Sequence, residues 1–312
     1  MNRSLKRILG YALAIGVLFF LGRVLVQTWD QVAASDFRFE FDALPLAVSL
    51  GLLFIARVFA VEAWRRILLS LGERMDLGFG VRAWFLSNLT RYIPGNIWQV
   101  ATLMVMLNAR GISKTNTLLS QAIYTALALT IAGIIGAFFL VVRPDLVSAW
   151  GAPTLGAFAP LLAALAFALV VVVFALPATN RWIVALTARV LRRELAAPAP
   201  SFARGLAPPL FSTLMWVANG VAFFLFIVSL TPLAPEHLPA FIAINAGAYW
   251  IGYVSFVTPS GLGFREGALA LMLATYFPTP IAVALSLAAR LWSTLGELLG
   301  VVIVWLITRR WA

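Results

Sequence analysis

Thr258-Pro259-Ser260-Gly261-Leu262-Gly263 interrupts an apolar segment that extends over residues 240–277. A second apolar segment, residues 81–107, is interrupted in the same way by Ile93-Pro94-Gly95-Asn96. Proline removes a backbone hydrogen-bond donor and glycine relaxes the backbone, so both interruptions predict broken helices. Each arm of the second segment has about 12 residues, or about 18 Å of helix, whereas the hydrocarbon core of a membrane is about 30 Å thick. Such an arm is too short to cross a membrane by itself.

The composition places both broken segments in a membrane. Of the 312 residues, 62% are hydrophobic and 11% are charged, whereas a soluble domain carries about 25% charged residues. Most of the other apolar stretches reach the roughly 17–25 residues that a spanning helix needs; they are residues 8–26, 44–60, 118–142, 155–176, 210–230 and 281–307. The chain has no cysteine and a single histidine. We therefore expect no metal centre, thiol chemistry or cofactor.

The positive charges indicate how the broken segments are arranged. The net charge is +11, and the basic residues lie in short loops beside apolar stretches. There they orient the chain and contact anionic lipid headgroups, so no nucleic-acid partner is expected. If each broken segment crosses the membrane, the basic loops divide almost evenly between the two sides. If both segments enter and return, only Arg38 and Arg143 remain outside, which the positive-inside rule favours.

The re-entrant arrangement predicts an inverted repeat. The expected fold is an all-α polytopic membrane protein, one transmembrane domain over residues 1–312, with about six full spans and two re-entrant broken-helix hairpins. The repeats cover about residues 8–142 and 154–308, and a basic amphipathic cytoplasmic linker covers about residues 178–207. Pro94 and Pro259 lie about 165 residues apart, and so do Ser120 and Ser286. Both termini are then cytoplasmic, in a bacterial inner membrane. An ordinary helix bundle with proline kinks is the alternative.

Polar residues at the two breaks are the candidate substrate-binding groups. Lipid offers no partner to bare backbone, so each break must face protein or a polar cavity. The breaks consist of Pro94, Gly95, Pro259, Gly261 and Gly263, and their polar neighbours are Arg91, Tyr92, Asn96, Gln99, Ser260, Arg265 and Glu266. The helix that begins near Gly263 is expected to direct its N-terminal amides at an anion. The alternative is that the breaks are kinks whose arginines extend to the membrane interface.

The last apolar stretch carries four polar residues on one predicted helical face. Their spacing of four, three and four residues aligns Ser286, Arg290, Ser293 and Glu297. Charges inside a membrane are costly and usually face a cavity and a partner. The expected pairs are Arg290 with Glu266 or Arg265 with Glu297, and a purely structural ion pair is the alternative.

Other intramembrane residues carry weaker signals. In the first half, Gln121 and Tyr124 occupy the place equivalent to the polar face of the last stretch. Single amides such as Asn219 and Asn245 are more typical of hydrogen bonds between helices than of ligand contacts. Arg57 lies near the end of the 44–60 stretch and can extend to the interface. Several glycines predict close helix packing: Gly133, Gly136, Gly296 and Gly300.

Two ordered motifs resemble a known family. They are Arg91-Tyr92-Ile93-Pro94-Gly95-Asn96-Ile97-Trp98 and Pro259-Ser260-Gly261-Leu262-Gly263-Phe264-Arg265-Glu266-Gly267. Both resemble signatures of the lysylphosphatidylglycerol synthetase transmembrane (flippase-like) family. The resemblance implies a membrane domain that, in its best-known member, moves an aminoacylated phospholipid to the outer leaflet. Where many members carry Gly-Glu, this chain has Trp98 and Gln99. The missing acid argues against a lysyl-lipid substrate, and the soluble aminoacyl-transferring domain is also absent.

The sequence therefore predicts a transporter or flippase for an anionic lipid or a lipid-linked substrate of isoprenoid or phospholipid type. No catalytic motif and no nucleotide-binding loop is found, so an enzyme is not expected. One alternative is a scaffold subunit that binds enzymes of envelope lipid or glycan synthesis. Another is an intramembrane enzyme in which Glu266 or Glu297 acts as general base on a lipid headgroup. Membrane lipids are the expected partners in each case.

Overall fold

The computed structural model describes residues 39–90, 98–143, 202–254 and 263–309, with a few isolated positions elsewhere. Within these ranges the regular structure is entirely helical, which confirms the all-α prediction. The eight α-helices and one short 3-10 helix are α2 (Ala43–Ser70), α3 (Leu77–Leu89), α4 (Trp98–Asn108), α5 (Lys114–Val142), α9 (Phe202–Val228), η2 (Pro235–His237), α10 (Leu238–Val254), α11 (Phe264–Leu273) and α12 (Thr279–Arg309). The stretches predicted to span at 8–26 and 155–176, and most of the 178–207 linker, lie outside the described residues.

Four of the helices are long and apolar enough to cross a membrane. They are α2, α5, α9 and α12, and their candidate spans cover Ala43–Ser70, Lys114–Leu140, Gly205–Val228 and Thr279–Ile307. Large apolar side chains such as Leu271 and Leu291 stand exposed on the outside of the bundle. An apolar exterior of this kind is what a membrane-embedded protein presents to lipid.

The remaining four helices are short and pack as two pairs, α3 with α4 and α10 with α11. Both ends of the α3–α4 pair lie together, because Glu73 before α3 accepts hydrogen bonds from the Ser113 N–H (3.1 Å) and the Asn116 amide (2.8 Å) after α4. Both ends of the α10–α11 pair also lie together, because the His237 ring before α10 contacts the Tyr276 ring after α11 at 5.2 Å between centroids. Each pair is therefore a hairpin with its base at one end of the bundle.

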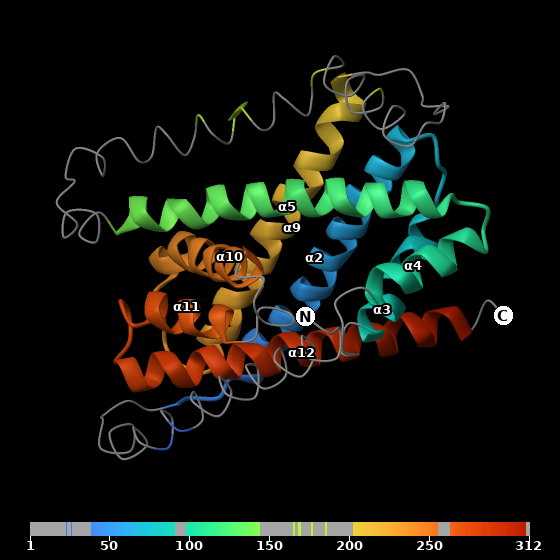
Figure 1. Ribbon diagram of the computed structural model, residues 1–312. Helices are drawn as coiled ribbons and strands as arrows, with labels where there is room; N and C mark the ends of the chain where they lie inside the picture. The colour runs from blue at the N-terminus through green and yellow to red at the C-terminus, as the bar shows by residue number, and fades with distance from the viewer. Residues whose placement is uncertain are drawn as a thin grey trace, which may run out of the picture.

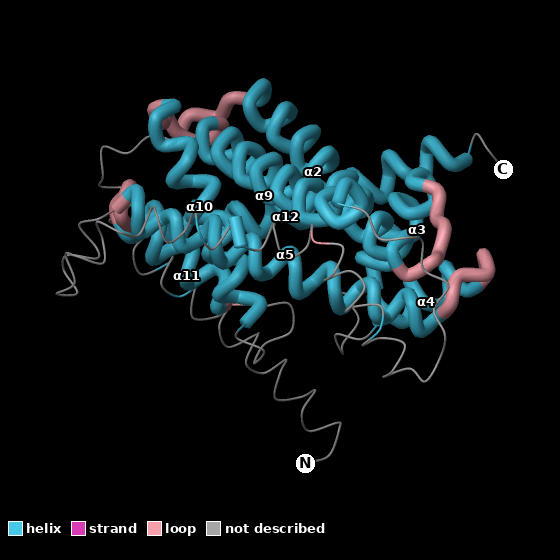
Figure 2. The backbone as a smooth tube through the Cα atoms, turned by 90° about the horizontal axis from the view of Figure 1, so that it is seen from above, coloured by secondary structure: helices cyan, strands magenta, loops and turns pink. Residues whose placement is uncertain are grey.

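The two hairpins lie at opposite ends of the bundle. Figures 1 and 2 show α10 and α11 on one side and α3 and α4 on the other, with α2 and α9 crossing between them. The start of α2 lies beside the end of α9, where Asp42 N–H donates to the Ser229 carbonyl at 2.9 Å. Each half packs on the hairpin of the other half: α5 lies against α10, and α12 lies against α3.

Glycines permit the closest helix approaches. A Cβ atom added at Gly136 of α5 would lie 2.5 Å from the Gly247 Cα of α10. Cβ atoms added at Gly296 and Gly300 of α12 would overlap Leu53 and Phe85, and one added at Gly133 would lie 3.0 Å from the Trp250 indole. These four glycines therefore serve close packing, as the sequence predicts.

Buried tryptophans join the long helices through their indole N–H groups. Trp64 of α2 donates to the Ser120 hydroxyl of α5 at 2.9 Å, and Trp292 of α12 donates to the Ser49 hydroxyl of α2 at 2.9 Å. Trp216 of α9 donates to the Ala128 carbonyl of α5 at 2.8 Å. A buried N–H group needs such a partner, because leaving it unpaired costs about 1–3 kcal/mol.

Replacement of Gly136 by alanine tests the contact between α5 and α10. We expect Gly136→Ala to destabilise the protein by about 1–3 kcal/mol, because its methyl group meets backbone rather than a movable side chain. Gly51→Ala is the matched control, since nothing lies within 4 Å of a Cβ at that helical position; it should be neutral or stabilise by up to about 1 kcal/mol. Thermal denaturation in detergent measures both, and equal stability of the two variants would contradict the packing argument.

Candidate functional site

The N-terminus of α11 is capped by a side chain of the same helix. Gly263 has φ 88°, a left-handed conformation that favours glycine, and its N–H donates to Glu266 Oε2 at 2.7 Å. Glu266 is three residues into the helix, so this is a capping-box contact. The sequence predicts that this helix end binds an anion from outside the chain. That prediction is wrong for the Gly263 amide, because the Glu266 carboxylate already occupies it.

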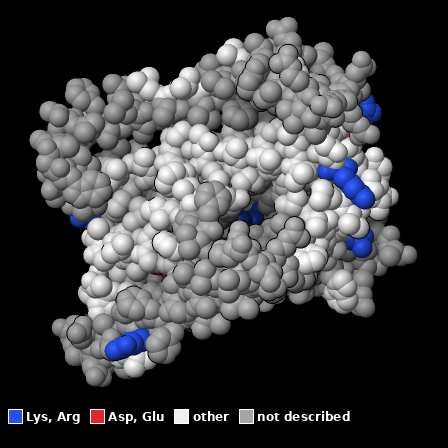
Figure 3. Space-filling model, viewed as in Figure 1, with Lys and Arg blue, Asp and Glu red and all other residues white. Residues whose placement is uncertain are grey.

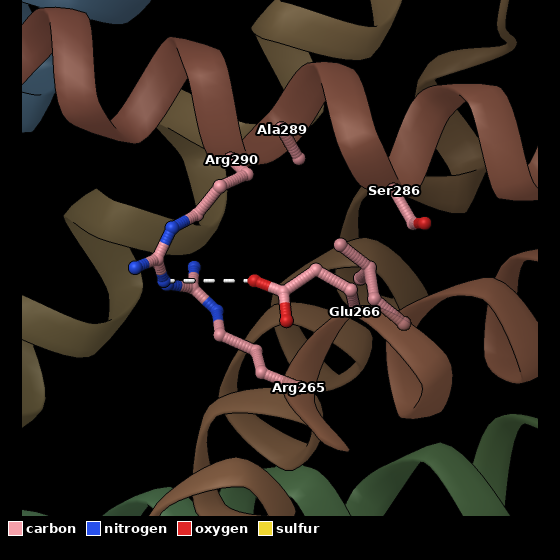
Figure 4. A pocket seen from close by; sticks show the side chains of 6 residues that line it. Arg265, Glu266, Ser286, Ala289 and Arg290 are labelled. Atoms are coloured by element: carbon pink, nitrogen blue, oxygen red, sulfur yellow. Dashed lines mark ion pairs between the residues drawn. The ribbon is translucent and has the colours of Figure 1, made fainter. Parts of the chain in front are cut away.

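The Glu266 carboxylate also forms an ion pair with α12. Its Oε1 lies 3.5 Å from Arg290 Nη1, which confirms the predicted pair, and Glu266 is only 2% exposed. Figure 4 shows the guanidinium groups of Arg265 and Arg290 lying next to one another beside this carboxylate. The residues around them line a narrow gap that has no room for even a water molecule; they are Arg265, Glu266, Leu269, Ser286, Ala289 and Arg290. Ligand pockets usually measure about 300–1,000 Å³, so a lipid headgroup requires this gap to open.

Arg265 is held against aromatic rings of α10. Its guanidinium carbon lies 5.6 Å from the centre of the Tyr249 ring. Tyr249 in turn packs edge-on against Trp216 at 5.0 Å and stacks on Tyr253 at 6.1 Å. A guanidinium over an aromatic face is attracted by the ring quadrupole. The α10–α11 hairpin therefore fixes the position of the positive charge that it carries.

A second ion pair joins α12 to α2. Arg57 Nη2 lies 3.8 Å from Glu297 Oε1, and the two side chains are 22% and 9% exposed. The sequence places Arg57 near a span end, and this is wrong because α2 continues to Ser70 and puts Arg57 halfway along the helix. Glu62 indicates that the helix continues, because it accepts hydrogen bonds from Arg65 and Arg66 one turn later in α2. Such local pairing allows α2 to continue through a charged stretch.

The polar face predicted for α12 faces the interior. Ser286, Ser293 and Glu297 are buried, whereas Leu291 and Leu298 on other faces are exposed. The period of the four polar residues thus predicts the orientation of this helix correctly.

The first half contributes neutral polar groups. Gln121 and Tyr124 of α5 are both buried, and Tyr124 packs edge-on against Trp84 of α3 at 5.5 Å. Tyr124 therefore lies against α3 in the interior of the bundle, and Gln121 is buried one turn earlier on α5.

Other predicted residues have structural partners or lie outside the described residues. Gln99 of α4 donates from its side-chain amide to Asn88 Oδ1 of α3 at 2.5 Å, so it links the arms of its hairpin. Asn245 donates to Asn219 at 2.8 Å, which confirms the predicted interhelical hydrogen bond. The residues that lie outside the described ranges are Arg91, Tyr92, Pro94, Gly95, Asn96, Pro259, Ser260 and Gly261.

In the part of the chain that the structure describes, the centre of the bundle is therefore charged and unequal in sign. Three guanidinium groups, from Arg57, Arg265 and Arg290, face the two carboxylates of Glu266 and Glu297. Figure 3 shows Lys or Arg atoms in a recess near the middle of the face in view and others at its edges. Among the described residues, no group of three or more histidine, aspartate or glutamate side chains could hold a metal ion. The arrangement suits the binding of an anion.

Comparison with known proteins agrees with the motifs. The chain matches the family described as the lysylphosphatidylglycerol synthase TM region over residues 7–300, nearly its whole length. The chain belongs to this family. No curated protein matches it.

Substitutions at Glu266 test the arrangement of charges at the α11–α12 contact. We expect Glu266→Ala to destabilise the protein by about 3–5 kcal/mol, because it uncaps α11 and leaves Arg265 and Arg290 adjacent without their carboxylate. Arg290→Ala should cost less, since Arg265 still faces Glu266. Glu266→Gln should lie between the two, because it keeps the acceptor for the Gly263 N–H.

Thermal denaturation of the purified variants gives this order of stabilities. If Arg290→Ala is as destabilising as Glu266→Ala, the Glu266 carboxylate does not both cap α11 and neutralise the two arginines.

Proposed function

We propose that this member of the lysylphosphatidylglycerol synthase TM family is a flippase-like transporter that moves an anionic lipid or lipid-linked substrate across a membrane. The observation that carries the proposal is the charged centre, in which, among the described residues, three buried or half-buried guanidinium groups outnumber two carboxylates. Placing ionisable groups within a membrane is costly, and such groups commonly mark a substrate pathway. A substrate with one negative charge balances the excess positive charge.

The hairpin geometry supports an inverted-topology repeat. Each hairpin enters and returns at the same end of the bundle, and the two hairpins enter from opposite ends. Helices α2 to α5 correspond in order to helices α9 to α12, and each half packs on the hairpin of the other. In transporters with inverted repeats, broken helices meet near the middle of the membrane and the two halves move relative to one another. We assign the same arrangement to this chain.

The distribution of basic residues supports an orientation. The end that carries the α3–α4 hairpin base holds Arg65, Arg66, Arg74, Arg110 and Lys114 in or next to its loops. At the other end Arg143 donates to the Thr275 carbonyl at 3.0 Å and lies over the Tyr276 ring. The positive-inside rule then assigns the α3–α4 end to the cytoplasm of a bacterial inner membrane, with both chain termini on that side.

Both central carboxylates are paired, which favours transport over an enzymatic reaction on a lipid headgroup. Glu266 accepts the Gly263 N–H and pairs with Arg290, and Glu297 pairs with Arg57. Carboxylate oxygens that already accept a backbone N–H or contact a guanidinium are less available to take a proton from a substrate. The charges are therefore better suited to hold an anion than to abstract a proton.

Lipid translocation in proteoliposomes tests the proposal. We expect the wild-type protein to accelerate exchange of a fluorescent phosphatidylglycerol between leaflets, measured by dithionite quenching. Arg265→Gln and Arg290→Gln should each slow this exchange about tenfold or more, because a hydrogen bond to a charged group contributes about 1.5–3 kcal/mol and about 1.4 kcal/mol is a factor of ten.

Arg74→Gln is the matched control, since Arg74 is exposed in the loop before α3 and should leave the rate unchanged. Thermal denaturation identifies any variant that is merely unfolded. If folded wild-type protein does not accelerate exchange of this lipid or of a fluorescent phosphatidylethanolamine, the transporter proposal is rejected in favour of a scaffold role.

Single cysteines test the hairpin topology in this naturally cysteine-free chain. Asn108 ends α4 and Thr279 begins α12, and both are exposed. We expect a membrane-impermeant maleimide to label Asn108→Cys only from the cytoplasmic side and Thr279→Cys only from the outside. Labelling of both positions from one side would show that a hairpin crosses the membrane.

A further inference from the structure

The two oxygen atoms of the Glu266 carboxylate make two different contacts. Oε2 accepts the Gly263 N–H at 2.7 Å, whereas Oε1 lies 3.5 Å from Arg290 Nη1. Hydrogen bonds between a charged nitrogen and a carboxylate oxygen measure about 2.7–2.9 Å. The contact with the start of α11 is therefore close, and the contact with Arg290 is loose.

Other ion pairs of this protein are tighter. Glu62 of α2 accepts hydrogen bonds from Arg65 Nε at 2.6 Å and from Arg66 Nε at 2.5 Å. These two arginines follow Glu62 in the same helix, so the pairs persist as long as that helix does. Glu266 and Arg290 lie on different helices, α11 and α12, and any increase in the spacing of these helices separates them.

The neighbouring guanidinium of Arg265 is held by α10. A Cβ atom added at Gly252 would lie 2.6 Å from the Arg265 Cβ, so the stem of Arg265 packs directly on this helix. The Arg265 guanidinium carbon lies 5.6 Å from the centre of the Tyr249 ring. Figure 4 shows the guanidinium groups of Arg265 and Arg290 beside the Glu266 carboxylate. One negative charge thus lies between two positive charges, one carried by the hairpin and one by α12.

We propose that the Glu266 carboxylate occupies the place of the substrate's anion between Arg265 and Arg290, and that a phosphate-type headgroup displaces it from Arg290. Only Oε1 has to leave, because Oε2 can keep the Gly263 N–H and with it the start of α11. The charges of the two arginines are then balanced by those of Glu266 and a headgroup with one negative charge. The inference rests on the proposed function and adds the residue that closes its substrate site.

The narrow gap between α11 and α12 agrees with this role. The gap has no room for a water molecule and Glu266 is only 2% exposed, so an anion reaches Arg290 only after the two helices separate. Separation without an anion leaves Arg290 in an apolar bundle without its carboxylate, which is costly. A headgroup that binds Arg290 removes this cost. The Glu266–Arg290 pair therefore keeps the gap closed until an anion replaces it.

Binding of a short-chain phosphatidylglycerol to the detergent-solubilised protein tests this role, with the concentration dependence of the melting temperature as the measure. We expect Glu266→Gln to bind this lipid about tenfold more tightly than the wild type, a difference of about 1.4 kcal/mol. The reason is that the amide oxygen keeps the Gly263 N–H while no carboxylate competes for Arg290. Diacylglycerol with the same chains has no phosphate and should bind both proteins equally. Inorganic phosphate shows whether the anion alone is recognised or the whole lipid.

Glu73→Gln is the matched control. It removes the same charge, but Glu73 accepts hydrogen bonds from the Ser113 N–H and the Asn116 amide rather than from a guanidinium. Its affinity for phosphatidylglycerol should equal that of the wild type. Glu297→Gln is a stricter comparison, because it breaks the other central ion pair and leaves the pair of Glu266 intact. It should raise the affinity less than Glu266→Gln does.

Arg290→Gln is the second variant, and it decides the question if Glu266→Gln does not fold. It removes the guanidinium that the headgroup takes over, so the affinity for phosphatidylglycerol should fall about tenfold or more. In proteoliposomes, Glu266→Gln should lower both the half-saturating lipid concentration and the maximal exchange rate, because tighter binding of the starting state does not speed the step that follows. A carboxylate with a purely structural role changes the maximal rate alone.

The outcomes separate this inference from the proposed function. Unchanged affinity in Glu266→Gln or in Arg290→Gln, or an equal gain in Glu297→Gln, overturns the inference and leaves Glu266 as a helix cap and structural ion pair. If the wild-type protein translocates lipid and these affinities do not change as expected, the transporter stands and the inference does not. If translocation is absent but Glu266→Gln binds phosphatidylglycerol more tightly, Glu266 closes an anion site that has no transport role.

Discussion

The structure depends on how the unpaired amides at the start of a helix find hydrogen-bond acceptors inside an apolar bundle. The first amides of a helix have no partner within the helix, and lipid supplies none. In α11 the Glu266 carboxylate accepts the Gly263 N–H, and the same carboxylate pairs with Arg290 of α12. One buried side chain thus stabilises the helix start and joins the hairpin to a long helix. The left-handed conformation of Gly263 is needed for the backbone to turn into this position.

The charged centre follows from that constraint. Glu266 caps the start of α11 and pairs with Arg290, so its negative charge neutralises the neighbouring Arg265 only in part. The Arg265 guanidinium also lies over the Tyr249 ring. Arg57 and Glu297 form the second pair between α2 and α12. A surplus guanidinium in a low-dielectric interior is costly unless an anion completes it. Arg57 and Arg290 each pair with a carboxylate, whereas Arg265 shares the Glu266 carboxylate with Arg290.

The sequence predicts those features that depend on period and charge alone. The four-three-four spacing on α12 predicts its buried polar face, and the need to pair charges predicts the contact between Arg290 and Glu266. It does not predict features that depend on where helices end. The sequence places Arg57 near an interface, because the apolar stretch stops before the helix does.

The two halves share an arrangement of helices but not a chemistry. The α10–α11 hairpin carries Arg265 and Glu266, whereas α3, on the opposite hairpin, and its neighbour α5 present Trp84, Gln121 and Tyr124. Few residues match between the halves. Similar packing of helices needs only small and apolar residues at the contacts, so the two hairpins can keep a similar arrangement while they carry different polar side chains.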